Sequence, residues 1–210
     1  MAKVWKHLKT ICKHKYYVGK YCFKFSLYWQ GIIHDLSKFS PTEFWTSVKY
    51  YQGNRSPIEA EKEEKGYSNC WAHHHNKNKH HWQYWLDHDA KQNPIPMKIP
   101  YKYVIEAFCD WMGANKAYLG NKSNPEELYT YYKNNIRVST EATNNIWNFQ
   151  TRQLWDTMIV DLKENGLDYV LKREKLGYYK SLYFTNKSAD GKYIIQDLGI
   201  YNELVNKYFN

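Results

Sequence analysis

Residues that suit metal ligation occur in one ordered series between residues 14 and 110. Seven of the nine histidines lie between His34 and His88. Imidazole and carboxylate groups together suit zinc, iron, manganese and similar divalent ions. We therefore predict a site for one or two divalent ions, with manganese, iron, cobalt, nickel and zinc as the candidates. In chain order the series has four pieces, which are His14, the doublet His34-Asp35, the cluster of His73-His74-His75 with His80-His81, and Asp110.

Helical spacing divides the histidine-rich segment into two faces. If residues 67–89 form one continuous helix, His74, Asn78 and His81 share a face because they are four and three residues apart. His73, Lys77 and His80 then share the adjacent face. In a later helical stretch Glu106 precedes Asp110 by four residues, and Asp110 is predicted to point inward.

Each member of the series also has an ordinary structural interpretation. A single histidine on an apolar face, such as His14, is more often a core or rim residue than a ligand. A run such as His73-His74-His75 is also typical of a solvated stripe, and Asp110 alone can be a buried hydrogen-bond acceptor. The combination of all four pieces within about 100 residues favours a metal site.

The elements that must position these residues are predicted to be helices. His7, Ile11, His14 and Val18 recur at spacings of four, three and four, which predicts a helix from Lys3 to about Lys20 that ends at Gly19. A second helix is predicted to start at Ser40-Pro41, where Glu43 completes a capping box.

Later segments have helix and turn signals of the same kind. Tyr101–Ala117 is predicted to be helical, and Asn124-Pro125 resembles another helix start. A long helix is expected from Ser139 to about Glu164, ended by Gly166. Residues 181–185 and 193–195 are β-prone around Asp190-Gly191, which predicts a small hairpin. The expected fold is mainly α, with one helical domain over 1–120 and a helical C-terminal extension over 121–210.

The composition indicates which binding partners and which cellular compartment to expect. Thirty lysines and arginines against 21 acidic residues give the 210-residue chain a net charge of +9, which favours phosphate-bearing ligands without separating mononucleotides from nucleic acid. No apolar run approaches the ~18 residues of a membrane helix, so no membrane association is expected. No secretory signal is visible, and the four cysteines form no C-x-x-C pair. We therefore expect a cytoplasmic protein with reduced thiols.

The order of these motifs resembles the HD-domain superfamily of metal-dependent phosphohydrolases. His14 is similar to the histidine of that superfamily's first helix, His34-Asp35 to its defining doublet, and Asp110 to the aspartate that closes its site. Residues 34–38 are similar to the His-Asp-x-Gly-Lys form of many members, with Ser37 in place of glycine. The resemblance implies a compact helical bundle in which these four residues hold a metal.

Residues 34–40, 66–68 and 73–85 more closely resemble an uncharacterised family from bacteria and phages, over roughly residues 7–117. The superfamily resemblance implies that Asp35 bridges to a second ion held by the 73–81 cluster. Of that cluster, His74 and His81 are favoured as ligands, followed by His80, whereas His73 and His75 are less favoured. Asn78 is expected to orient a histidine or to contact substrate, and Glu106 to support a ligand.

The function expected from this resemblance is hydrolysis of a nucleotide or related phosphate ester by metal-activated water. Asp35 and Lys38 are the expected catalytic residues, with Lys38 neutralising phosphate oxygens. Two alternatives stay open. One is an HD-type di-iron oxygenase, and the other is a non-catalytic basic module that binds nucleic acid or a partner and uses a structural metal.

Overall fold

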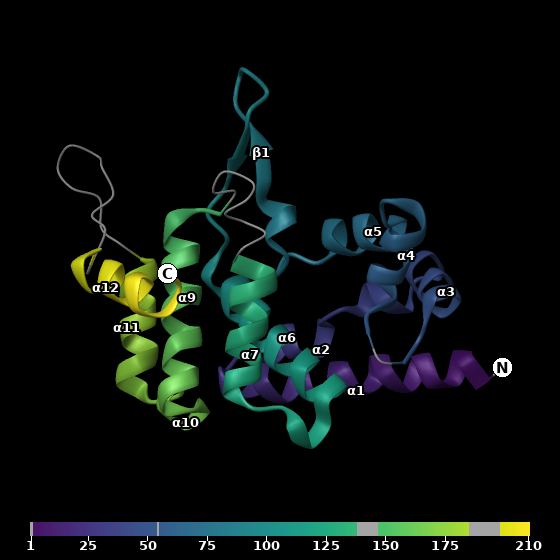
Figure 1. Cartoon of the computed structure of the whole chain (residues 1–210), viewed down its shortest axis with the longest axis horizontal. Helices are drawn as coiled ribbons and strands as arrows, with labels where there is room; N and C mark the ends of the chain where they lie inside the picture. The colour runs from purple at the N-terminus through teal and green to yellow at the C-terminus, as the bar shows by residue number, and fades with distance from the viewer. Residues whose placement is uncertain (1, 54, 138–146, 185–197) are drawn as a thin grey trace. The chain divides into compact units, whose positions relative to one another are not determined.

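The structure is a computed structural model that describes residues 2–53, 55–137, 147–184 and 198–210 (Figure 1). These residues form a mainly α fold, as predicted from the sequence. No helix among them is long and apolar enough to span a lipid bilayer. The elements are α1 (Ala2–Lys24), α2 (Tyr28–Ile33), the 3-10 helix η1 (Leu36–Phe39), α3 (Pro41–Tyr50), α4 (Pro57–Lys65), α5 (Asn69–Lys77), η2 (Trp82–Trp85), β1 (Leu86–His88), β2 (Pro94–Pro96), α6 (Tyr101–Leu119), η3 (Gly120–Lys122), α7 (Pro125–Tyr131), the π-helical turn η4 (Tyr132–Arg137), α9 (Phe149–Asn165), α10 (Leu167–Val170), α11 (Arg173–Tyr183) and α12 (Leu198–Tyr208).

The chain divides into two compact units. Unit 1 comprises Met1–Trp85 and Ile105–Ser123, and unit 2 comprises Leu86–Val104 and Asn124–Asn210. All the predicted ligands belong to unit 1. The expected division into residues 1–120 and 121–210 stays a prediction.

The first helix of unit 1 is longer than the sequence suggested. It continues through Gly19 to Lys24 and buries His7, His14 and Val18 on one face. The predicted end at Gly19 is wrong because this glycine serves packing rather than helix termination. A Cβ built on Gly19 would lie 3.3 Å from the carbonyl oxygen of Gly31 in α2, so the missing side chain allows the two helices to approach closely.

A second close approach brings α1 against α6. A Cβ on Gly113 would lie 2.3 Å from Val18 Cγ2 and 2.8 Å from the Val18 nitrogen, a space that only glycine leaves free. His14 is one turn before Val18 on α1, and Asp110 is one turn before Gly113 on α6. The crossing therefore places His14 and Asp110 in the same interior.

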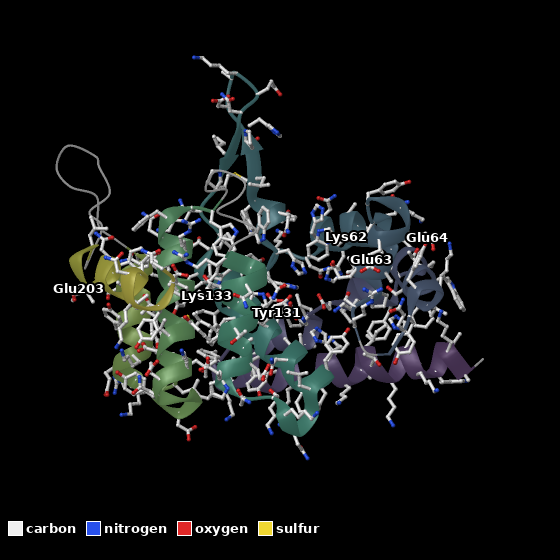
Figure 2. The ribbon with its side chains drawn as sticks, viewed as in Figure 1. Lys62, Glu63, Glu64, Tyr131, Lys133 and Glu203 are labelled. Atoms are coloured by element: carbon white, nitrogen blue, oxygen red, sulfur yellow. The ribbon has the colours of Figure 1, made fainter. Side chains whose placement is uncertain are left out.

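Helices α3, α4 and α5 pack together and complete unit 1. The predicted start at Ser40-Pro41 is confirmed, since the Ser40 hydroxyl accepts a hydrogen bond from the Glu43 backbone N–H. Ser68 caps α5 in the same way through the N–H of Trp71. Figure 2 labels Lys62, Glu63 and Glu64 on α4, whose charged side faces solvent.

Unit 2 is built around α9, which contacts α7, α10, α11 and α12. The predicted end of α9 at Gly166 is confirmed, and residues 139–146 of the predicted helix lie outside the described part of the chain. Residues 147 and 148, which were also predicted to be helical, precede the helix, and Asn148 caps its start at Phe149. β1 and β2 pair antiparallel, with Leu86 opposite Pro96. At the core, the buried Asp156 carboxylate accepts hydrogen bonds from the hydroxyls of Tyr132 and Tyr201, each at 2.7 Å.

The hairpin predicted near the C-terminus is not borne out where the structure describes it. Residues 181–183 belong to α11, and residues 185 and 193–195 lie outside the described ranges. Leu182 and Tyr183, which suggested a strand, are instead buried with Tyr179 at helical spacing. Packing against α9 outweighs their β propensity. Figure 2 labels Tyr131, Lys133 and Glu203 elsewhere in this unit.

Candidate metal centre

The His34-Asp35 doublet lies in the turn between α2 and η1. Asp35 has a left-handed backbone conformation, with φ 53° and ψ 29°, which is uncommon outside glycine and clusters at functional sites. The ammonium of Lys15 holds this turn by donating to the carbonyl oxygens of Ile32 (2.6 Å) and His34 (2.8 Å). Helix α1 therefore supplies His14 to the interior and Lys15 to the backbone beside it.

Four side chains from three segments converge in the first cluster, which consists of His14, His34, Asp35 and Asp110. His14 Nε2 lies 3.3 Å from Asp35 Oδ2 and 3.1 Å from Asp110 Oδ1. His34 Nε2 lies 3.3 Å and 3.4 Å from the same two oxygens. Around an ion with bonds of about 2.1 Å, ligand atoms lie about 3.0 Å apart in octahedral and about 3.4 Å apart in tetrahedral coordination. The spacing of the four atoms therefore fits a single ion.

Most of the converging atoms lack other hydrogen-bond partners. The Nε2 atoms of His14 and His34, Oδ1 of Asp35 and Oδ1 of Asp110 are buried without a hydrogen-bond partner. Oδ2 of Asp35 is paired with the Lys38 ammonium, 2.5 Å away. Buried polar atoms are normally paired, so a set of unpaired atoms that face one another needs an explanation. A shared cation is the partner that imidazole nitrogens and carboxylate oxygens accept together.

A second cluster shares Asp35 with the first and adds His74, His80 and His81. Asp35 Oδ1 lies 3.4 Å from His74 Nε2 and 3.5 Å from His80 Nε2. The Nε2 atoms of His80 and His81 are buried without a hydrogen-bond partner. Asp35 therefore presents Oδ2 to the first cluster and Oδ1 to the second, as a carboxylate that bridges two ions would.

The second cluster does not form on one helix face. Helix α5 ends at Lys77, and Asn78 at its C-cap is extended, with φ −116° and ψ 106°. The chain then turns back, so His80 and His81 approach from beyond the helix. The continuous helix considered from the sequence is therefore wrong, and His80 joins His74 instead of lying on an adjacent face.

Two buried glutamates contact the Nδ1 atoms of the histidines. Glu106 Oε1 lies 3.0 Å from His34 Nδ1 and 3.2 Å from His80 Nδ1. Glu43 accepts from His74 Nδ1 and His73 Nδ1, each at 2.7 Å. A hydrogen bond from Nδ1 fixes the ring orientation and leaves the Nε2 lone pair free for a metal. Glu106 was expected in this role, whereas Glu43 was interpreted from the sequence only as a capping residue.

The remaining predicted residues lie around this centre. Asn78 donates to the Ser37 hydroxyl at 2.7 Å and to the His74 carbonyl at 2.8 Å, so it ties the end of α5 to η1. Lys38 Nζ lies 2.5 Å from Asp35 Oδ2. Within the described residues, His73 and His75 belong to neither cluster. Lys15 and Glu43 had no sequence signal that separated them from ordinary surface and cap residues, and Ser37 was noted only as a replacement for the usual glycine.

The electrostatics of the centre favour anionic carboxylates. Burial alone would raise the pKa of Asp35, but His34, Lys38 and His74 outweigh it and hold that pKa well below its usual range. Asp110 behaves in the same way through His14 and His34. Burial and the neighbouring His80 hold the pKa of His81 well below its ordinary value, so its imidazole is neutral and able to ligate. Burial would lower the pKa of His34, but Asp35, Asp110 and Glu106 outweigh it and raise that pKa well above its ordinary value. The carboxylates and His81 are therefore in the protonation state that metal binding requires, whereas an ion would have to displace a proton from His34.

Comparison with known proteins places the chain by sequence. Residues 3–152 match the family of unknown function DUF5662. The chain belongs to DUF5662. No curated protein and no solved structure matches it. Both clusters and both supporting glutamates lie inside the part of the chain that matches DUF5662.

Proposed function

We propose that this protein is a metal-dependent phosphohydrolase that acts on a nucleotide or a related phosphate ester. One observation carries the proposal: two buried histidine and carboxylate clusters share Asp35, which presents one oxygen to each. A pair of adjacent ion sites joined by a carboxylate is the arrangement that suits displacement at phosphorus. The resemblance to the HD-domain superfamily points to the same reaction class.

The donor set defines which ions the centre would hold. The first site offers two imidazoles and two carboxylates, and the second offers three imidazoles and one carboxylate. These donors suit manganese, iron, cobalt, nickel or zinc better than calcium or magnesium, which prefer all-oxygen surroundings. His14, His34, Asp35 and Asp110 would hold the first ion, and Asp35, His74, His80 and His81 the second. When bound, such an ion supplies Lewis acidity and lowers the pKa of water from 15.7 to about 7.

Lys38 is the residue that would meet the phosphate. Its side chain is 27% exposed, whereas Asp35 beside it is 2% exposed, so the ammonium lies between the buried carboxylate and solvent. Burial opposes its charge, but Asp35 and Asp110 outweigh this effect and raise the pKa of Lys38. A permanently charged ammonium there would neutralise the phosphate oxygens while water adds to phosphorus and the bond to the leaving oxygen breaks.

The experiment combines metal analysis with a substrate panel. Protein purified without a histidine tag is analysed for metals, then assayed for phosphate release from nucleotides and simple phosphate esters with each candidate ion. We expect one or two ions per chain and metal-dependent phosphate release. Asp35→Ala should abolish that release and reduce the bound metal, while Asp87→Ala, at an exposed position in β1, should change neither. Full activity in Asp35→Ala would contradict the proposal.

Two other outcomes would replace the proposal. Two irons per chain with oxygen consumption and no phosphate release would favour the di-iron oxygenase. Salt-dependent nucleic-acid binding that survives chelation, without turnover of any ester, would favour the non-catalytic module.

A further inference from the structure

His7 is a buried polar residue that the proposed chemistry does not use. It lies on α1 with 5% of its surface exposed, and neither ring nitrogen has a hydrogen-bond partner. Its ring contacts Phe44 and Tyr51, with centroids 5.7 Å and 5.2 Å away. Burying an imidazole without a hydrogen bond to either nitrogen costs free energy. A ligand that hydrogen-bonds to these nitrogens would offset that cost.

His7 lies on the same face of α1 as His14. Seven residues separate the two, which is two helical turns and about 10 Å along the axis. Burial and the charge of Lys38 lower the pKa of His7 to about 4, so at neutral pH its ring is uncharged and offers one donor and one acceptor. Lys38, which lies on the solvent side of Asp35, is near enough to His7 for its charge to contribute to this lowering of the pKa.

That side is where the centre meets solvent. Among the first-cluster side chains Asp110 is the most exposed, at 14%, whereas His34 is fully buried. Tyr118 is 42% exposed, and its phenol interacts electrostatically with Lys38, Tyr51 and Asp110. Tyr51 in turn contacts His7 and shares a 2.9 Å hydrogen bond with Thr10. Tyr51 therefore adjoins His7, and Tyr118 lies close enough to Tyr51, Lys38 and Asp110 to interact with them electrostatically.

We infer that His7, Tyr51 and Tyr118 form a subsite for the organic group of the substrate, in which the His7 ring hydrogen-bonds an uncharged polar edge. This inference rests on the proposed function and names its substrate class, a phosphate monoester of a nucleoside. A nucleoside whose phosphate lies beside Lys38 is long enough to span the roughly 10 Å that separates His14 from His7 along the helix. Its base presents neutral donors and acceptors to the imidazole and an aromatic face to the tyrosines.

The test measures binding rather than turnover. Titration calorimetry on the metal-loaded full chain compares a nucleoside phosphonate, in which carbon replaces the ester oxygen, with methylphosphonate. We expect His7→Phe to weaken binding of the nucleoside phosphonate about tenfold or more and to leave methylphosphonate binding unchanged. His7→Gln, which keeps a donor and an acceptor, should retain most of the affinity. His88→Phe, at an exposed position in β1, is the matched control.

Each other outcome has a defined meaning. Equal weakening of both ligands by His7→Phe, or no weakening of either, would overturn the inference, as would a wild-type protein that does not bind the nucleoside phosphonate. Thermal unfolding of His7→Phe shows whether the variant is folded, and His7→Gln provides the comparison if it is not. If the wild type hydrolyses no ester but nucleoside phosphonate binding still depends on His7, the proposed function fails while the subsite stands.

Discussion

Asp35 is the residue that links the two clusters of the candidate centre. Its backbone is left-handed, its two oxygens face different clusters, and Lys38 lies 2.5 Å away. Removing such a buried charge leaves the facing groups uncompensated, which costs more than the loss of a surface pair. The glutamates behind the histidines are the next layer of this arrangement, and Glu43 provides the clearest test because it serves only one cluster.

Glu43→Gln should weaken the second ion and spare the first. The amide is close in size to the carboxylate but is a poorer acceptor for His74 Nδ1, which lies 2.7 Å from it. Loss of such a supporting carboxylate typically weakens metal affinity about 10–100-fold. Metal analysis after dialysis should therefore find a stoichiometry that falls from two toward one. Glu64→Gln, at a side chain 57% exposed on α4, should leave it unchanged. Equal loss of both ions would contradict the assignment of Glu43 to one site.

At the scale of elements, the crossing of α1 and α6 decides whether the first cluster forms. The two helices meet where Val18 fills the space left by the absent Gly113 side chain. His14 and Asp110, one turn away on each helix, reach a separation of 3.1 Å. Because packed interiors resist small displacements, a change at the crossing is transmitted to the ligands.

Gly113→Ala should therefore destabilise the protein and weaken the first ion. The added methyl would lie 2.3 Å from Val18 Cγ2, and overpacking of this kind costs about 1–3 kcal/mol. Chemical denaturation would measure the loss, and metal titration would measure the affinity.

Gly177→Ala provides the matched control, since nothing lies within 4 Å of the Cβ it would carry in α11. It should instead stabilise the fold by about 0.5–1 kcal/mol through the higher helix propensity of alanine. A Gly113→Ala variant as stable as the wild type would contradict the tight crossing.

Across the whole molecule, a positively charged chain contains a centre suited to cations. The net charge of +9 repels free ions at long range, so affinity has to come from the local carboxylates and desolvated imidazoles. In the ion-free structure, histidines and Lys38 provide the countercharge to Asp35 and Asp110. Binding of an ion to the folded state alone should therefore raise global stability.

Manganese or zinc should raise the thermal unfolding midpoint of the wild type. At an ion concentration 100 times the dissociation constant, the gain is about 2.7 kcal/mol, or roughly 5–10 °C for a chain of this size. Differential scanning calorimetry before and after chelation would measure it. Calcium, which prefers oxygen ligands, should produce little shift, and Asp35→Ala should produce none with any of the ions. An equal shift in Asp35→Ala would place the ion elsewhere.

The sequence predicted local structure well where a local signal determines it. The starts at Ser40-Pro41 and Asn124-Pro125 and the end at Gly166 are confirmed, because a cap acts through neighbouring backbone groups. The predicted helix end at Gly19 and the predicted strand that includes residues 181–183 were wrong for the same reason. Packing against α2 and α9 used these residues in ways that their intrinsic propensities do not indicate.

By itself, the sequence determined the residue types of the centre, their order and the mainly α fold. Tertiary structure alone decided which atoms meet. Each oxygen of Asp35 faces a different cluster, and His80 lies beside His74 although α5 ends before it. Glu43, predicted only as a capping residue, accepts hydrogen bonds from two histidines. The physical reason is that helical periodicity specifies neighbours along one helix, whereas the approach of separate helices depends on packing over the whole interior.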